Sequence, residues 1–331
     1  MTSWLKVVNR LKKKCLYCGK EVNSFCNSHS VPAFTLRNIA INGEVYYSNT
    51  LVDFPLLDTK KGVNKAGTFQ VICRECDSKI FSAYEEPSNY NNTPTPQMLA
   101  QIAMKNYLKL ISKRMIEHSL YEMIGEINPL TEGFIEHMHS VQKLDLDEVQ
   151  KGFEKAKRLS KKNWDREYYL FYYEKLDYVV PIAFQVPITL ISDLDGGIVN
   201  NIYNMSTQYC TQDLHICVFP LEDSSIVMMF VDSNHKKYRN FYKKFNELPL
   251  QEKLGIINYI IFLYSEDIFL SKEISEEVLK DKNLLDVSKQ TVLARTINPD
   301  PEVIIEEAKR VHDLSKWSSI PNLLSEKYKI R

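Results

Sequence analysis

Two Cys-x-x-Cys pairs constrain this chain more than any other feature of its sequence. Cys15 and Cys18 form the first pair within CLYCG, and Cys73 and Cys76 form the second within CRECD. Two thiolates at this spacing can bind one tetrahedral metal ion, and the glycine after Cys18 allows the tight turn behind them. Together the pairs predict a structural Zn²⁺ held by four sulfurs, and therefore a zinc-binding module near the N-terminus.

A second set of ligands could hold the same ion. CNSHSVPAF follows the first pair and contains Cys26 and His29. The compact alternative set consists of Cys15, Cys18, Cys26 and His29. It would suffice for one Zn²⁺, but it would leave the second Cys-x-x-Cys pair without a role. We therefore favour the four-thiolate site, in which His29 is not required as a ligand.

The composition is that of an ordinary globular protein. The chain has 331 residues, 44% of them hydrophobic and 25% charged, which is enough for a sizeable core in two or three domains. A formal net charge of zero argues against polybasic binding to nucleic acid but leaves a local basic face open. The longest apolar run, 254–264, is too short to span a bilayer and predicts a buried helix. We expect a cytoplasmic protein with no membrane contact, whose thiols bind metal rather than form disulfides.

The alternation of patterns along the chain predicts an α+β fold in three regions. Residues 1–92 are expected to form the zinc module, and residues 93–164 a helical connector. Residues 165–331 are expected to form an antiparallel sheet followed by C-terminal helices, because consecutive strands there have short connections.

The connector is expected to contain two helices. Thr95 can cap the first helix, Pro96 suits its first position, and Met104 begins an apolar stripe along one face. Gly125 is a suitable stop for this helix. A second, very polar helix is expected over 145–163.

The third region is expected to begin with strands. The aromatic segment 168–176 reads as one strand, and 182–190 alternates with a period of two, which predicts one buried face. Pro187 favours an edge strand or a bulge. Further strands are expected at 214–219 and 225–231, and helices at 236–247, 250–264, 272–280 and 301–314. Asp300 can cap the last of these helices.

Over residues 15–86 the order of motifs resembles the zinc-bearing branch of the HNH (ββα-metal) nuclease superfamily. The first cysteine pair precedes SHSVP, which is similar to the xHxxP element of that family. A strand then leads into CRECD, where the second pair opens a helix. The resemblance implies a treble-clef-like zinc fold for this part of the chain.

The resemblance also implies a reaction. The histidine of xHxxP is the general base that activates water for attack on a phosphodiester, so His29 would take this role, with Pro32 stiffening its hairpin. A catalytic Mg²⁺ or Mn²⁺, separate from the structural zinc, would have Asp77 as its ligand. The implied function is a metal-dependent endonuclease, with DNA a better candidate substrate than RNA. By analogy, such architectures suggest bacterial restriction or phage defence.

The sequence departs from the family pattern at the cation site. Ser28 stands where the family has a metal-binding Asp or His, and Thr68 stands where it has the central Asn. Asp77 replaces the closing His or Asn, with Glu85 and Glu86 further along. The alternative hypothesis is therefore a non-catalytic zinc module that recognises nucleic acid or a protein partner. A third hypothesis is a structural partner subunit whose enzyme lies in another chain. The expected partners are nucleic acid and, as alternatives, another protein or further copies of the chain in a homo-oligomer.

Three weaker patterns remain. EHMH at 136–139 could bind metal on a strand but not on a helix, where His137 and His139 would not share a face. The basic and aromatic stretch 236–244 could lie on nucleic acid, although a solvated face over buried aromatic rings is more typical. The basic run Lys12–Lys14 lies beside the first Cys-x-x-Cys pair, which we call the first zinc knuckle, and is a candidate for phosphate contacts.

Overall fold

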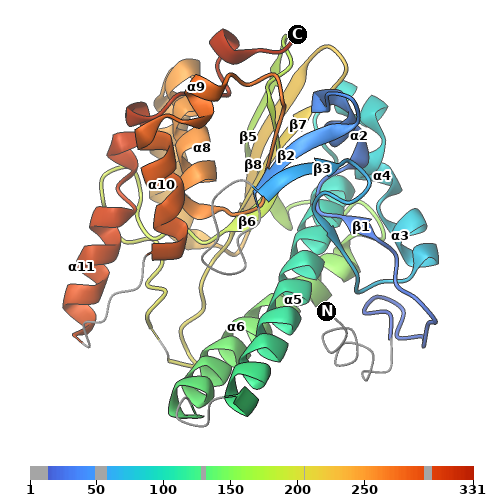
Figure 1. The fold of residues 1–331 in the computed structure, drawn as a ribbon, viewed down its shortest axis with the longest axis vertical. Coiled ribbons are helices and arrows are strands. Elements are labelled where there is room, and N and C mark those ends of the chain that lie inside the picture. The colour runs from blue at the N-terminus through green and yellow to red at the C-terminus, as the bar shows by residue number, and fades with distance from the viewer. Residues whose placement is uncertain (1–13, 49–57, 128–131, 205, 294–299) are drawn as a thin grey trace. The chain divides into compact units, whose positions relative to one another are not determined.

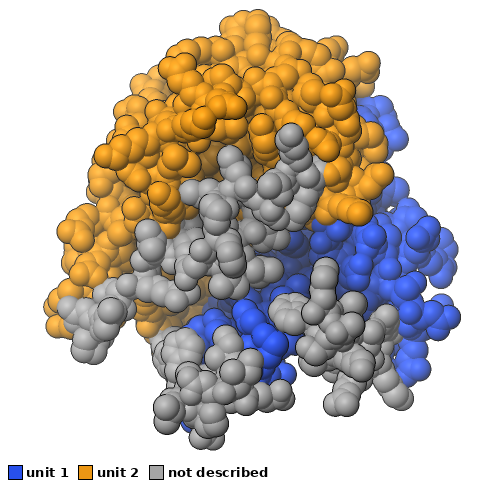
Figure 2. All heavy atoms as spheres, viewed as in Figure 1, with its two compact units in different colours: residues 1–30, 68–89, 94–164 blue, residues 31–67, 90–93, 165–331 orange. Residues whose placement is uncertain are grey.

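The computed structural model describes residues 14–48, 58–127, 132–204, 206–293 and 300–331. Within them the fold is a mixture of helices and antiparallel strands, as predicted (Figure 1). The chain divides into two compact units (Figure 2). Unit 1 comprises residues 1–30, 68–89 and 94–164, and unit 2 comprises residues 31–67, 90–93 and 165–331.

These units differ from the three regions expected from the sequence. The helical connector belongs to unit 1, together with both cysteine pairs, whereas residues 31–67 belong to unit 2. The cause is strand pairing, because β2 (Glu44–Ser48) pairs with β9 (Ile268–Leu270) in the sheet of unit 2. A strand as short as β9 gives little periodicity, so its distant partner was not predictable from the sequence.

Unit 1 combines one pair of short strands with five helices among its described residues. β1 (Ser28–His29) pairs antiparallel with β4 (Thr68–Phe69), with Ser28 opposite Phe69 and His29 opposite Thr68. The helices are α3 (Arg74–Ile80), α4 (Ser82–Glu85), α5 (Pro96–Ile127), α6 (Glu132–Leu159) and the start of the 3-10 helix η1 (Pro87–Asn91). The chain therefore presents two strands and then a helix, α3, in that order.

The long helices α5 and α6 only partly follow the sequence prediction. The side-chain hydroxyl of Thr95 accepts a hydrogen bond from the Met98 amide at 3.3 Å, and Pro96 is the first helical residue, as predicted. The predicted stop is wrong, because α5 continues past Gly125 to Ile127. A glycine inside a helix costs only about 1 kcal/mol, which packing of a long helix can offset. α6 likewise begins well before the predicted start.

An antiparallel sheet of seven strands lies at the centre of unit 2 (Figure 1). Its order is β3-β2-β9-β6-β7-β8-β5. The remaining strands are β3 (Asp58–Gly62), β5 (Tyr168–Leu176), β6 (Ile182–Ile188), β7 (Leu214–Pro220) and β8 (Ser225–Asp232). The predicted strands at 168–176, 214–219 and 225–231 therefore lie within a residue or so of the observed ones.

Both faces of β6 are buried, so the expectation of one buried face was wrong. Ile182 and Phe184 pack into the main core, which also contains apolar residues of α8 (Leu250–Tyr264). Ala183 points to the opposite face and packs in a second cluster with Leu36 of α2 (Ala33–Ile39). Residues from the N-terminal third of the chain thus cover a face that the local pattern assigned to solvent.

Pro187 is accommodated at a local edge of β6. β9 pairs with Ile182 and Ala183, whereas Pro187 pairs with His215 of β7 and lies beyond the end of β9. A residue without an amide hydrogen is tolerated there. The prediction of an edge position is therefore correct for this part of the strand.

Helices α8, α9 and α10 lie beside the sheet of unit 2 (Figure 1). The predicted helix 250–264 matches α8, whereas the one predicted at 272–280 is reduced to α9 (Glu276–Leu279), which begins after Ser275. The bounds not yet given in unit 2 are those of α7 (Arg239–Glu247), α10 (Lys282–Leu293), α11 (Pro301–Val311), η3 (Lys236–Tyr238), η4 (Leu314–Ser319) and η5 (Glu326–Tyr328). Asp300 caps α11, as predicted, by accepting from the Glu302 amide. Across the described residues, a helix with the length and apolarity to cross a bilayer is not found.

Candidate metal centre

The two cysteine pairs converge on one point in unit 1. The sulfur atoms of Cys15, Cys18, Cys73 and Cys76 all lie within 4.8 Å of one another. Zinc–sulfur bonds of about 2.3 Å place the sulfurs of a tetrahedral site roughly 3.8 Å apart, so only a small adjustment separates the cluster from that geometry. These four residues therefore fit a zinc ion bound by four thiolates.

Backbone hydrogen bonds shape the first knuckle around Cys15. The Cys15 amide donates to the Lys20 carbonyl at 3.0 Å, and the Gly19 amide donates to the Cys15 carbonyl at 2.8 Å. Gly19 has a φ of 72°, which glycine adopts without the steric cost that other residues carry. The tight turn expected after Cys18 is therefore present.

The second cysteine pair donates a backbone hydrogen bond to a sulfur of the first pair. Cys73 is the residue preceding α3, and its amide donates a hydrogen bond to the Cys15 sulfur at 3.3 Å. Burial of Cys15 opposes ionisation, but amide groups of Cys18, Cys73 and Tyr17 lower its pKa to about 7. The thiolate is the form that binds zinc, so this environment favours Cys15 as a ligand, whereas burial and the neighbouring thiols raise the pKa of Cys76 in the absence of metal.

Cys26 and His29, the alternative ligands, are not members of the four-cysteine cluster. The Cys26 thiol donates to Asp77 Oδ2 at 3.4 Å. Burial and the negative charge of Asp77 raise the pKa of this thiol to about 11, which disfavours the thiolate. His29 lies in β1 opposite Thr68. The structure groups the first knuckle with Cys73 and Cys76, which is the arrangement that we favoured.

Asp77, the predicted ligand of a catalytic cation, is bound by a buried lysine. Lys105 Nζ lies 3.0 Å from Asp77 Oδ1 and 2.9 Å from the Ser28 hydroxyl, which itself donates to Asp77. The same ammonium lies 3.1 Å from Glu85 Oε1 and 3.7 Å from the centre of the Phe81 ring. The Lys105 side chain is only 1% exposed. Burial opposes ionisation of Asp77, but Lys105 and Ser28 together lower its pKa.

His29 follows Ser28 in the strand β1. Successive side chains of a strand point to opposite faces, and Ser28 directs its hydroxyl toward Asp77 and Lys105. This alternation predicts that His29, the next residue of β1, points to the other face. His29 as general base and Asp77 as cation ligand therefore stay predictions.

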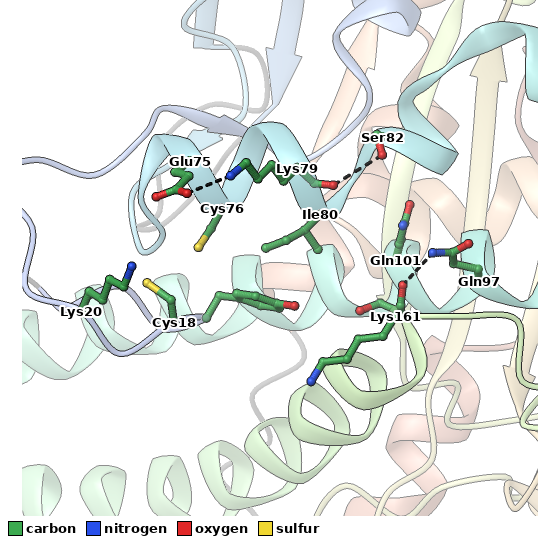
Figure 3. A pocket seen from close by; sticks show the side chains of 12 residues that line it. Cys18, Lys20, Glu75, Cys76, Lys79, Ile80, Ser82, Gln97, Gln101 and Lys161 are labelled. Atoms are coloured by element: carbon green, nitrogen blue, oxygen red, sulfur yellow. Dashed lines mark hydrogen bonds and ion pairs between the residues drawn. The ribbon is translucent and has the colours of Figure 1, made fainter.

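A cleft of about 430 Å³ opens beside the cysteine cluster (Figure 3). Cys18 and Cys76 line it together with Lys20, Lys79 and Lys161, and Tyr17 contributes an aromatic ring. Lys79 pairs with Glu75 at 2.8 Å. A zinc ion with four thiolates carries a net charge of about −2, which these lysines would offset.

The weaker sequence patterns contribute little to this site. Residues 136–139 lie in α6, so the geometry needed for a metal site at EHMH is absent; His139 stacks on His118 at 4.4 Å, and the His137 side chain lies outside the described residues. In the 236–244 stretch, Tyr238 and Phe241 are buried, whereas the lysines are mostly exposed. This is the solvated face over aromatic rings that we considered more typical. Of Lys12–Lys14, only Lys14 lies within the described residues, and it is exposed.

Sequence reasoning missed Lys105, the residue that organises the Asp77 cluster. It lies in MLAQIAMKNYL, whose residues are buried on nearly all sides of α5. A lysine inside such a run is itself a signal, because lysine is almost never fully buried without a charged partner. No family model matches the chain, and comparisons with curated proteins and with solved structures find no match.

Proposed function

We propose that unit 1 is a zinc-stabilised, HNH-like module that recognises nucleic acid. The observation that carries the proposal is the order β1, β4, α3 around the cysteine cluster, with one cysteine pair before β1 and the other opening α3. Two strands and a helix bracketed by two zinc knuckles are what the resemblance to the ββα-metal superfamily implies.

Side chains beside the cysteine cluster support nucleic acid as the partner. Lys20, Lys79 and Lys161 line the cleft, and Lys157 Nζ lies 5.2 Å from the centre of the Tyr17 ring. Basic side chains interleaved with aromatic rings are the means by which proteins hold phosphates and stack on bases. The alternative partner is another protein or a second copy of the chain. The binding experiment below distinguishes nucleic acid from these two.

Recognition without cleavage fits the cluster around Asp77 better than hydrolysis does. Hydrolysis of the HNH type requires a divalent cation to stabilise the phosphorane and the leaving oxygen. In this chain the ammonium of Lys105 already lies against Asp77, at the position that such a cation would need. A metal-dependent endonuclease is the second candidate, and the contact between Ser28 and Asp77 favours it, because these residues stand at the family's cation-binding positions.

Binding is tested by fluorescence anisotropy with single-stranded and duplex DNA and RNA of one length. We expect the protein to bind, and the logarithm of its dissociation constant to rise linearly with the logarithm of the salt concentration. Lys20→Ala and Lys161→Ala should each lower the magnitude of that slope by about 1, which corresponds to one lost phosphate contact. Lys151→Ala removes an exposed lysine of α6 and should leave the slope unchanged. Absence of binding to every oligonucleotide at low salt would reject nucleic acid as the partner.

Cleavage is tested with plasmid DNA and with RNA in the presence of Mg²⁺ or Mn²⁺. We expect the wild-type protein and His29→Ala to leave both substrates intact. Cleavage by the wild-type protein that disappears in His29→Ala would instead establish the endonuclease.

A further inference from the structure

We infer that Lys105 is a built-in substitute for a divalent cation. Its ammonium occupies a site formed by three oxygen atoms from three different elements: the Ser28 hydroxyl of β1, Asp77 Oδ1 of α3 and Glu85 Oε1 of α4. The lysine itself comes from a fourth element, α5. The wild-type chain therefore holds the Lys105 side chain at this position and takes no Mg²⁺ or Mn²⁺ there.

The surroundings of the ammonium have the chemistry of a hard-cation site. Carboxylate and hydroxyl oxygens are the donors that Mg²⁺ and Mn²⁺ prefer. The three nitrogen–oxygen distances lie between 2.9 and 3.1 Å, whereas Mg²⁺ requires about 2.1 Å. The oxygens are thus spaced for an ammonium group, and a small divalent ion would need them to move inward.

Burial and charge explain why Lys105 stays in this site. A buried ammonium is stable only with compensating partners, and Asp77, Glu85 and the face of the Phe81 ring provide them. Two carboxylates and one ammonium leave one net negative charge. Without the lysine, two neighbouring carboxylates would repel each other, and the vacated space would favour entry of another cation.

This inference depends on the lysine-centred cluster alone. Its consequence, that unit 1 binds nucleic acid without cation-dependent cleavage, rests on the proposed function. The two are separable by experiment, because cation binding is measured without nucleic acid.

The experiment compares Mn²⁺ binding by the zinc-loaded, full-length wild type and Lys105→Ala, using the loss of the free Mn²⁺ signal in electron paramagnetic resonance. We expect the variant to bind one additional Mn²⁺ per chain, with an affinity at least about tenfold above any wild-type binding. The double variant Lys105→Ala/Asp77→Asn should lose this gain. Lys151→Ala, which removes an exposed lysine of α6, should behave as the wild type does.

Thermal unfolding provides a second readout. Mn²⁺ should raise the unfolding midpoint of Lys105→Ala but not that of the wild type. Where the alanine variant fails to fold, Lys105→Gln replaces it in both measurements, because glutamine keeps a neutral donor of similar reach.

Two results would overturn the inference. One is Mn²⁺ binding by the wild type that Asp77→Asn abolishes, since a divalent ion would then displace Lys105. The other is a folded Lys105 variant that gains no Mn²⁺ binding. Oligonucleotide binding by the same preparations reports separately on the proposed function, so failure of one leaves the other standing.

Discussion

The backbone amide of Cys73 donates a hydrogen bond to the sulfur of Cys15 at 3.3 Å, although 58 positions separate the two residues in the chain. The second knuckle thus stabilises a thiolate of the first even before a metal is considered. Amide donors of this kind are part of what lowers the Cys15 pKa to about 7, against the effect of burial. The two pairs should therefore act as one unit in metal binding.

The first prediction concerns zinc content. Cys15→Ser and Cys73→Ser should each lose the bound zinc, because a structural site requires all four thiolates. Cys26→Ser should keep it, since the Cys26 thiol is bonded to Asp77. Elemental analysis of purified protein measures the ratio of zinc to protein chains. The control is Cys210→Ser, which changes an exposed cysteine of unit 2. Retention of zinc by Cys73→Ser together with its loss from Cys26→Ser would instead indicate the compact ligand set.

The second prediction concerns the contact between α5 and α6. A Cβ atom at Gly152 would lie 2.5 Å from the Tyr107 ring, so Gly152→Ala should force the helices apart. We expect a loss of about 1–3 kcal/mol in the free energy of unfolding, measured by urea denaturation. Gly133→Ala on the same helix meets no atom within 4 Å and should be neutral or slightly stabilising. Equal effects of the two substitutions would refute this packing argument.

The third prediction concerns the pH dependence of stability in unit 2. Burial, with a smaller effect of His235, lowers the pKa of His215 to about 3. Below the unfolded value of about 6.5, only the unfolded chain binds this proton, so the stabilisation is complete above pH 6.5 and is lost as the pH falls toward 3. His215 should account for a loss of about 2 kcal/mol between pH 7 and pH 5.

The matching experiment measures urea unfolding of the wild type and His215→Gln at both pH values. The variant should be less stable at pH 7, because His215 stacks on Phe230 with ring centres 4.6 Å apart. Its stability should nevertheless fall less between pH 7 and pH 5 than that of the wild type. Gly133→Ala, which removes no titratable group, should keep the wild-type pH dependence. If His215→Gln and the wild type lose equal stability between pH 7 and pH 5, the pH dependence does not come from His215.

The fourth prediction concerns the buried hydroxyl of Tyr238. It donates to the Gln212 carbonyl at 2.6 Å and accepts from the Leu190 amide at 3.2 Å. Tyr238→Phe leaves the Leu190 amide without this acceptor, while the Gln212 carbonyl keeps a bond from the Asn200 side chain, and should cost about 1–3 kcal/mol of unfolding free energy. Tyr169→Phe, whose ring is exposed, should change stability by less than about 0.5 kcal/mol. A denaturation midpoint for Tyr238→Phe equal to that of the control would show that water replaces the missing bonds.

Local signals in the sequence predicted much of this molecule. The spacing of the cysteines predicted their convergence, and caps such as Thr95 and Asp300 marked helix starts correctly. What escaped prediction depends on distant partners. The burial of Ala183 requires α2, which lies far upstream, and the role of Lys105 requires Asp77 on another element. Local periodicity carries no information about such partners, so the lysine-centred cluster became visible only in three dimensions.

The assignment of residues 31–67 to unit 2 has a consequence for dissecting the protein. The strands β1 and β4 of unit 1 lie on either side of this segment in sequence, so the chain leaves unit 1 after residue 30 and returns at residue 68. Because of this interleaving, no single truncation point yields either unit intact. Nicking the backbone within residues 31–67 would separate the two cysteine pairs covalently, leaving the metal as one link between the fragments beside the pairing of β1 with β4 and of β2 with β9. A protease-clipped chain should therefore stay together in native buffer, and a chelator should weaken the association by removing the metal while the strand pairing remains.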